Sequence, residues 1–184
     1  GKALIDKALL EEVTNLVEWP KSVVGGFDES FLEVPAEALI ASMQDHQKFF
    51  PVVDIANECL MARFITVANL DSQNFDAVRQ GFERVITPRL ADARFFWDQD
   101  NRSSLDSRLS SLDNIVFQDT LGSVGDKSRR LKDISENLAE FTGFNKSHAG
   151  RAALLCKCDL VSQMVGEFPE LQGIMGGYYA KQSG

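Results

Sequence analysis

The chain has 184 residues, of which 44% are hydrophobic and 25% are charged, a composition typical of soluble globular proteins. The formal net charge of −8 argues against a protein that coats nucleic acid nonspecifically, and no apolar run reaches the ~18 residues that span a bilayer. Residues 1–100 hold 9 Lys and Arg against 17 Asp and Glu, whereas residues 101–184 hold 10 of each. We therefore expect an acidic and a neutral structural unit.

Residues 1–74 alternate between helical and extended patterns. The spacing predicts a helix over residues 5–18, ended by Pro20, and a second helix that begins near Pro35. The stretches SVVGGF, KFFPVVDI and MARFITVANL have the composition of strands. This half of the chain is therefore predicted to be an α+β unit with a small antiparallel sheet.

From residue 75 onward the hydrophobic period is helical. One helix is predicted from Phe75 to Ile86, and Thr87 followed by Pro88 then reads as the N-cap and first residue of another. The stretch DKSRRLKDISENLAEFTGF predicts an amphipathic helix with Gly143 at its C-cap. Its inward face is predicted to consist of Leu131, Ile134, Leu138 and Phe141.

Two further helices complete the predicted all-helical second part. Residues 148–168 (HAGRAALLCKCDLVSQMVGEF) are apolar nearly all round, which predicts one buried helix. The following stretch, PELQGIMGGYYAKQ, predicts a last helix with Pro169 at its first position and a continuation that is missing.

The stretch LLCKCDL raises the question of a metal site. Structural zinc sites use four ligands at spacings such as CxxC, and no second cluster accompanies Cys156 and Cys158. We therefore expect both cysteines in the core, as reduced thiols of a cytosolic protein, and no metal.

Asp159 needs a partner if its helix is buried, because an unpaired buried charge costs several kcal/mol. Arg151 and His148, eight and eleven residues earlier, fall towards the same side of the predicted helix. We predict that these three residues form a structural, buried polar seam.

Basic residues are the other candidates for a site. The segment KSRRLK supplies Lys127, Arg129, Arg130 and Lys132, and Arg84 and Arg89 lie in the preceding helical region. These side chains could bind phosphate groups or form only surface ion pairs with acidic neighbours, and the sequence leaves both readings open. The sequence contains no P-loop, GxGxxG motif or nucleophile elbow.

The order of the segments resembles the beta subunit of bacterial-type glycyl-tRNA synthetase. The segments that carry the resemblance are LLEEVTNLVEWP, GGFDESFLEVPAEALIASMQDHQKFFPV, RLADARFFWDQD, FQDTLGSVGDK and RAALLCKCDLVSQMVGEFPELQGIMGGYYA. The resemblance implies an internal piece of a longer subunit. Residues 1–74 would be the end of a tRNA-editing-like module, and residues 75–184 a degenerate HD-like helical domain truncated at its C-terminus.

The resemblance also implies a function. The family forms a cytoplasmic alpha2 beta2 tetramer that joins glycine to tRNA-Gly, with ATP used at the alpha subunit. This piece would carry no catalytic residue and bind no cofactor, and its tRNA-contact candidates would be the six basic residues named above. Two alternatives remain, a docking module for the alpha subunit and an HD-type metal phosphohydrolase. The phosphohydrolase is disfavoured because the chain has only two histidines, His46 and His148, and Cys158 precedes Asp159.

Overall fold

The computed structural model describes residues 1–183, which form two compact units. The first unit is Gly1–Phe95, and the second runs from Phe96 onward. The division falls inside helix α3 (Phe75–Asp100), later than the boundary at residues 74 and 75 that the change of period suggested. The first part of α3 belongs to the first unit because Phe82 packs edge-on against Phe49, with ring centroids 5.6 Å apart. The assignment of the two parts to editing-like and HD-like modules stays a prediction.

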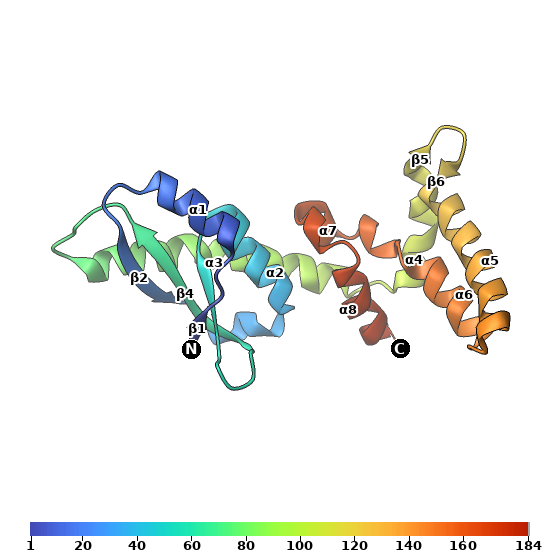
Figure 1. The fold of residues 1–184 in the computed structure, drawn as a ribbon, viewed down its shortest axis with the longest axis horizontal. Helices are drawn as coiled ribbons and strands as arrows, with labels where there is room; N and C mark the ends of the chain where they lie inside the picture. The colour runs from blue at the N-terminus through green and yellow to red at the C-terminus, as the bar shows by residue number, and fades with distance from the viewer. Residues whose placement is uncertain (184) are drawn as a thin grey trace. The chain divides into compact units, whose positions relative to one another are not determined.

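The first unit is built on a four-stranded antiparallel sheet, which confirms the predicted α+β class (Figure 1). The strand order is β1-β3-β4-β2. The strands are β1 (Lys2–Ala3), β2 (Lys21–Gly26), β3 (Phe50–Val53) and β4 (Leu60–Ala68). Gly25 on β2 lies opposite Phe64 on β4, and a Cβ atom at Gly25 would come within 2.3 Å of the Phe64 ring. The glycine of the SVVGGF segment is therefore required by close packing.

Short helices surround this sheet. They are α1 (Lys7–Leu16), the 3-10 turn η1 (Glu29–Glu33), α2 (Ala36–Ala41) and the π-helical turn η2 (Ser42–His46). The Asp6 carboxylate accepts a hydrogen bond from the Leu9 amide at 2.8 Å, which caps α1. Leu9 and Val13 then pack with Phe50, so this side of α1 covers the sheet, whereas Leu10 and Leu16 are exposed.

Helix α3 continues through Pro88, so the prediction of a new helix at that point was wrong. Proline removes one backbone hydrogen bond from a helix interior. The helix continues because Ile86, Leu90 and Ala93, on both sides of the proline, are completely buried. Thr87 is not an N-cap, and its hydroxyl donates to the Glu83 carbonyl at 2.7 Å.

The second unit is helical apart from one small hairpin. After the end of α3 its elements are α4 (Leu105–Arg108), η3 (Leu109–Asn114), β5 (Val116–Gln118), β6 (Gly122–Ser123), α5 (Val124–Thr142), α6 (Lys146–Leu155), η4 (Cys158–Val161), α7 (Gln163–Glu167), η5 (Pro169–Leu171) and α8 (Ile174–Ser183). Among the described residues, none of the helices is both long and apolar enough to cross a bilayer.

The long helix α5 begins at Val124, two residues before the predicted stretch, and ends as predicted. Ser123 and Asp126 form a reciprocal capping box, and Gly143 at the C-cap has a φ of 73°, which confirms the predicted C-cap. Helices α5 and α6 lie side by side in Figure 1, and a Cβ atom at Gly150 would meet the Glu136 side chain at 2.2 Å. Gly150 therefore permits the close approach of α6 to α5.

Three predictions for this unit were wrong. The expected single helix over residues 148–168 is divided into α6, η4 and α7, and only Gly150 of α6 is buried. The expected last helix is divided into η5 and α8 around Gly173, whose φ is 86°. The predicted inward face of α5 is largely exposed, since Ile134, Leu138 and Phe141 are 55%, 57% and 87% accessible. Periodicity identifies an apolar face but does not say what covers it.

Candidate functional site

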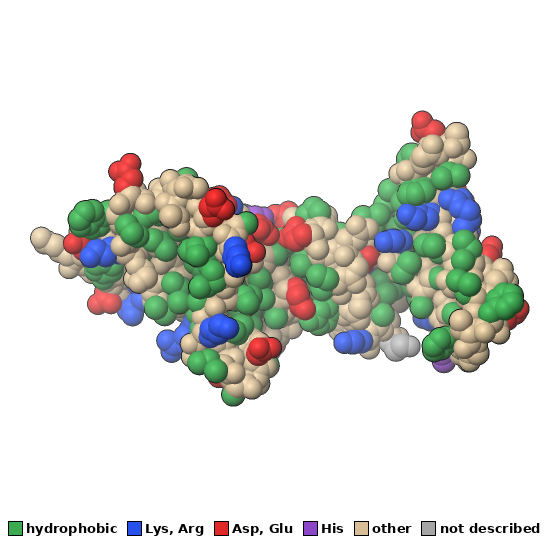
Figure 2. All heavy atoms as spheres, viewed as in Figure 1, with side chains coloured by type: hydrophobic (Ala, Val, Ile, Leu, Met, Phe, Trp, Pro, Cys, Tyr) green, Lys and Arg blue, Asp and Glu red, His purple; other side chains and the backbone are tan. Residues whose placement is uncertain are grey.

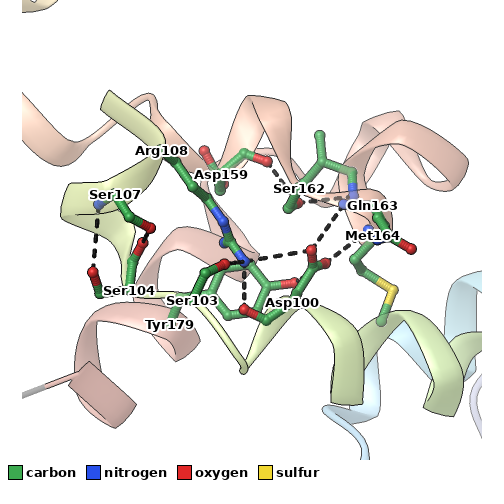
Figure 3. Close-up of polar contacts among 11 residues, drawn as sticks. Asp100, Ser103, Ser104, Ser107, Arg108, Asp159, Ser162, Gln163, Met164 and Tyr179 are labelled. Atoms are coloured by element: carbon green, nitrogen blue, oxygen red, sulfur yellow. Dashed lines mark hydrogen bonds and ion pairs between the residues drawn. The ribbon is translucent and has the colours of Figure 1, made fainter. Parts of the chain in front are cut away.

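The centre of the second unit is the buried carboxylate of Asp100, at the end of α3 (Figure 3). Its Oδ1 atom accepts from the Gln163 amide, and its Oδ2 atom accepts from the Met164 amide, both at 2.9 Å. Tyr179 of α8 donates its hydroxyl to Oδ2 at 2.8 Å. Asp100 thus satisfies amide groups at the start of α7 and binds α8 to the end of α3.

Arg108 is the buried cation of this network. Its Nη2 atom donates to the Asp100 carbonyl and lies 3.4 Å from the Asp100 Oδ1 atom and 3.3 Å from the Ser103 hydroxyl. Its guanidinium carbon lies 4.8 Å from the centroid of the Tyr179 ring. A buried ion pair is destabilising unless further contacts compensate for desolvation. Here the carbonyl and the hydroxyl accept from Nη2 and the ring lies against the guanidinium, while Nη1 has no hydrogen-bond partner among the described residues.

Tyr179 is held as a neutral hydrogen-bond donor. Burial raises the pKa of its hydroxyl, and the hydrogen bond to Asp100 raises it further. The Trp97 ring stacks on the Tyr179 ring, with centroids 5.6 Å apart and an interplanar angle of 22°. The phenol is thereby fixed in position as well as in protonation state.

Asp159 is the second buried carboxylate, and it also binds the start of a helix. It is 0% exposed, and its Oδ2 atom accepts from the amides of Gly173, at 2.5 Å, and Gly176, at 3.0 Å, at the beginning of α8. A Cβ atom at Gly176 would lie 3.2 Å from the Asp159 carboxyl carbon. Gly176 therefore allows the backbone to approach the carboxylate closely.

The predicted seam of Asp159 with Arg151 and His148 is wrong, although Asp159 is buried as predicted. Both of the other side chains are exposed, and Arg151 makes a bidentate ion pair with Asp106 at 2.8 and 2.9 Å. The prediction assumed a continuous helix, but α6 ends at Leu155, so the helical register does not extend to residue 159. Arg151 and His148 instead line a cavity of about 510 Å³ between α4, α6 and α8.

The two neighbouring cysteines lie in different environments. Cys158 is completely buried, and burial raises the pKa of its thiol to about 11. Cys156 is exposed, contrary to prediction, and its thiol donates to the Ala153 carbonyl at 3.1 Å. Within residues 1–183, no group of three or more His, Cys, Asp and Glu side chains is arranged to hold a metal ion.

Three of the basic candidates on α5 already have partners. Arg129 makes two contacts of 2.8 Å with the Asp113 carboxylate and one of 3.1 Å with Asp126. Lys132 pairs with Glu136 at 3.0 Å, and the Lys127 ammonium lies 4.0 Å from the centroid of the Phe117 ring on β5. These contacts compete with phosphate for Arg129 and Lys132 in particular, because each is bound to a carboxylate.

The remaining basic candidates are Arg130, Arg84 and Arg89. All three are exposed, and none has a carboxylate partner in the part of the chain that the structure describes. Arg84 and Arg89 lie in the first compact unit, whereas the KSRRLK residues lie in the second. All six tRNA contacts stay predictions.

Asp100, Arg108 and Tyr179 were not predicted as site residues from the sequence. Asp100 belongs to the polar run WDQD, and Arg108 lies among serines, so both resemble surface residues. Their partners are up to 79 residues away in sequence, as for Tyr179 and Asp100. Local patterns contain no signal for such a network.

Comparison with known proteins identifies the family. A family model described as glycyl-tRNA synthetase beta subunit matches residues 1–184. The chain belongs to this family. This confirms the resemblance carried by the ordered segments.

Individual members of the glycyl-tRNA synthetase beta subunit family support the assignment. The glycine–tRNA ligase beta subunit of Chromohalobacter salexigens is 54% identical over 182 residues, which are 99% of this chain and 26% of that relative. The proteins of the same name from Marinobacter nauticus and Pseudomonas entomophila are 53% and 51% identical over 184 residues, all of this chain and 26% and 27% of theirs. The chain thus spans about a quarter of the length of these relatives.

Proposed function

We propose that this chain is a non-catalytic part of a beta subunit that supports the joining of glycine to tRNA-Gly. The proposed holoenzyme is a cytoplasmic alpha2 beta2 tetramer in which ATP is used at the alpha subunit. The proposal is supported by relatives named glycine–tRNA ligase beta subunit, a name that implies at least one other kind of subunit.

The observation that carries the non-catalytic role is the use of the Asp100 carboxylate. Its two oxygens accept from two backbone amides, one phenol and one guanidinium. A general base must reach the proton that it abstracts, and a metal ligand needs a free lone pair directed at the ion. A carboxylate with four donors in a buried site is suited to structural support instead.

Docking is the second element of the proposal. The basic side chains Arg129 and Lys132 are paired with carboxylates, which weakens a phosphate-binding role for the start of α5. The apolar residues further along α5 are exposed in this chain. We therefore favour packing of the helical unit against another part of the synthetase, with tRNA contacts limited to exposed residues such as Arg84 and Arg89.

A reconstitution experiment tests the non-catalytic role. The full-length beta subunit that contains this chain is mixed with its alpha subunit, and glycylation of tRNA-Gly is measured for Tyr179→Phe and Asp100→Asn. If these side chains are structural, each variant should lower the melting temperature, while kcat at a temperature where the protein is folded stays within a few-fold of the parent.

The control is Arg151→Ala, which removes only an exposed ion pair in the same unit. A loss of kcat of about 100-fold or more in folded Tyr179→Phe protein would contradict the non-catalytic role. Manganese-dependent hydrolysis of nucleotides by the parent, abolished in Asp159→Asn, would favour the phosphohydrolase alternative.

A further inference from the structure

Helix α5 exposes a continuous stripe that is basic at its start and apolar further along. Viewed along the axis of a helix with 3.6 residues per turn, the side chains of the stripe point within about 40° of the direction of the Ile134 side chain. They are Lys127, Arg130, Ile134, Leu138 and Phe141. Figure 2 shows Lys and Arg side chains gathered at the start of α5, beside the β5–β6 hairpin, and hydrophobic side chains further along the helix.

The stripe extends past both ends of the helix. At its start the Lys127 ammonium lies over the ring of Phe117, which is itself 42% exposed. At its end Phe144 follows the C-cap glycine and is 75% exposed. The exposed area of Ile134, Leu138 and the two phenylalanines at the end of the stripe is of the order of 500 Å², as large as the patches that commonly mark interaction sites.

No carboxylate lies on this face of α5. The acidic residues of the helix point about 80° or more away from the direction of Ile134, the centre of the stripe. They are Asp126, Asp133, Glu136 and Glu140. Of the two cations on the stripe, Arg130 has no carboxylate partner within residues 1–183, and the Lys127 ammonium contacts an aromatic ring. The stripe therefore combines apolar surface with positive charge, and none of the carboxylates of α5 lies on it.

We infer that this stripe docks an amphipathic helix of a partner protein segment, with its apolar side on Ile134, Leu138 and Phe141 and its carboxylates facing Lys127 and Arg130. The inference deepens, and rests on, the docking role proposed above. Packing of one helix on another covers the branched aliphatic side chains of Ile134 and Leu138, which lie between the cations and the phenylalanines and offer no flat face to a nucleotide base. Carboxylates on the partner would complement the two cations and set its direction along α5.

A second copy of the chain does not fit the stripe equally well. A stable pair of copies buries about 800 Å² on each partner, of which the apolar side chains of the stripe supply roughly 500 Å². Two stripes facing each other in parallel would also bring the cations of one copy against those of the other. In the antiparallel arrangement each cation would meet the aromatic end of the other stripe, where a cation–π contact would take the place of an ion pair.

A pair of synthetic helices tests the inference. Both carry the same apolar face, but one has glutamates and the other lysines at the positions that face Lys127 and Arg130. Binding to the chain of residues 1–184 is followed by fluorescence anisotropy, with tRNA as a third ligand. We expect the glutamate helix to bind about tenfold more tightly than the lysine helix.

Two double variants check both halves of the stripe. Lys127→Glu with Arg130→Glu should reverse the preference in favour of the lysine helix, a gain of function that misfolding cannot imitate. Ile134→Ser with Leu138→Ser should weaken both helices by at least about tenfold. The matched control replaces two exposed leucines of α1, Leu10 and Leu16, with serine and should leave binding unchanged.

Equal binding of both helices, binding of neither, or no reversal in the charge variant would overturn the inference. Binding of tRNA that depends on Lys127 and Arg130, without binding of either helix, would identify the stripe as an RNA contact instead. Any of these results would leave the reconstitution test of the non-catalytic role unaffected, because that test reads aminoacylation and not binding to α5.

Discussion

Replacement of Asp159 by alanine should destabilise the second unit strongly. The substitution removes two hydrogen bonds from a buried carboxylate to the amides of Gly173 and Gly176, and each bond to a charged group contributes about 1.5–3 kcal/mol. It also removes a buried charge whose Oδ1 atom has no hydrogen-bond partner among the described residues, which offsets part of the loss. We therefore expect the free energy of unfolding to fall by about 2–4 kcal/mol.

Urea unfolding followed by tryptophan fluorescence can measure this loss in the correct unit. The chain has two tryptophans, and Trp97 stacks on Tyr179 in the second unit. Trp19 lies in the first unit and is 61% exposed, so a Trp19→Phe background leaves Trp97 as the reporter. For a unit of this size, a loss of 2–4 kcal/mol corresponds to a decrease in melting temperature of roughly 8–30 °C.

The matched control is Arg151→Ala, which breaks an exposed ion pair and should cost about 0.2–1 kcal/mol. Asp159→Asn keeps one acceptor oxygen and should fall between the two. If Asp159→Ala were no more destabilising than Arg151→Ala, the capping of α8 by this carboxylate would not contribute to stability, and the reasoning would be refuted.

The remaining predictions concern single groups. The Cys158 thiol, with a pKa of about 11, should resist a thiol reagent at pH 8 while the other two thiols react, and three reactive thiols in the native chain would contradict its burial. The raised pKa of Tyr179 contributes stability that is present below the unfolded value of about 10 and is lost as pH rises above it, so Tyr179→Phe should flatten the decline of stability measured between pH 9 and 11. Gly25→Ala should destabilise by about 1–3 kcal/mol because its Cβ atom would meet the Phe64 ring. Gly81→Ala, in open space on α3, should stabilise by about 0.5–1 kcal/mol, and similar melting temperatures for the two glycine variants would contradict the packing argument.

The sequence by itself determined the local elements of this protein. The three apolar stretches of the first unit predicted β2, β3 and β4, because alternation and β-branched composition act within a few residues. The C-cap at Gly143 was also predictable, since a left-handed residue at a helix end favours glycine whatever its surroundings. The ordered segments identified the family without any knowledge of contacts.

Only the tertiary structure decided which side chains are buried together. Asp100 finds its partners 63, 64 and 79 residues later in the chain, and such contacts have no local pattern. The continuity of α3 through Pro88 depends on buried residues on both sides of it, which compensate for the lost hydrogen bond. The period of α5 predicted an apolar face, but burial of that face depends on a neighbour, and the described residues leave Phe141 87% exposed. Periodicity is a property of one helix, whereas burial is a property of the surfaces that meet it.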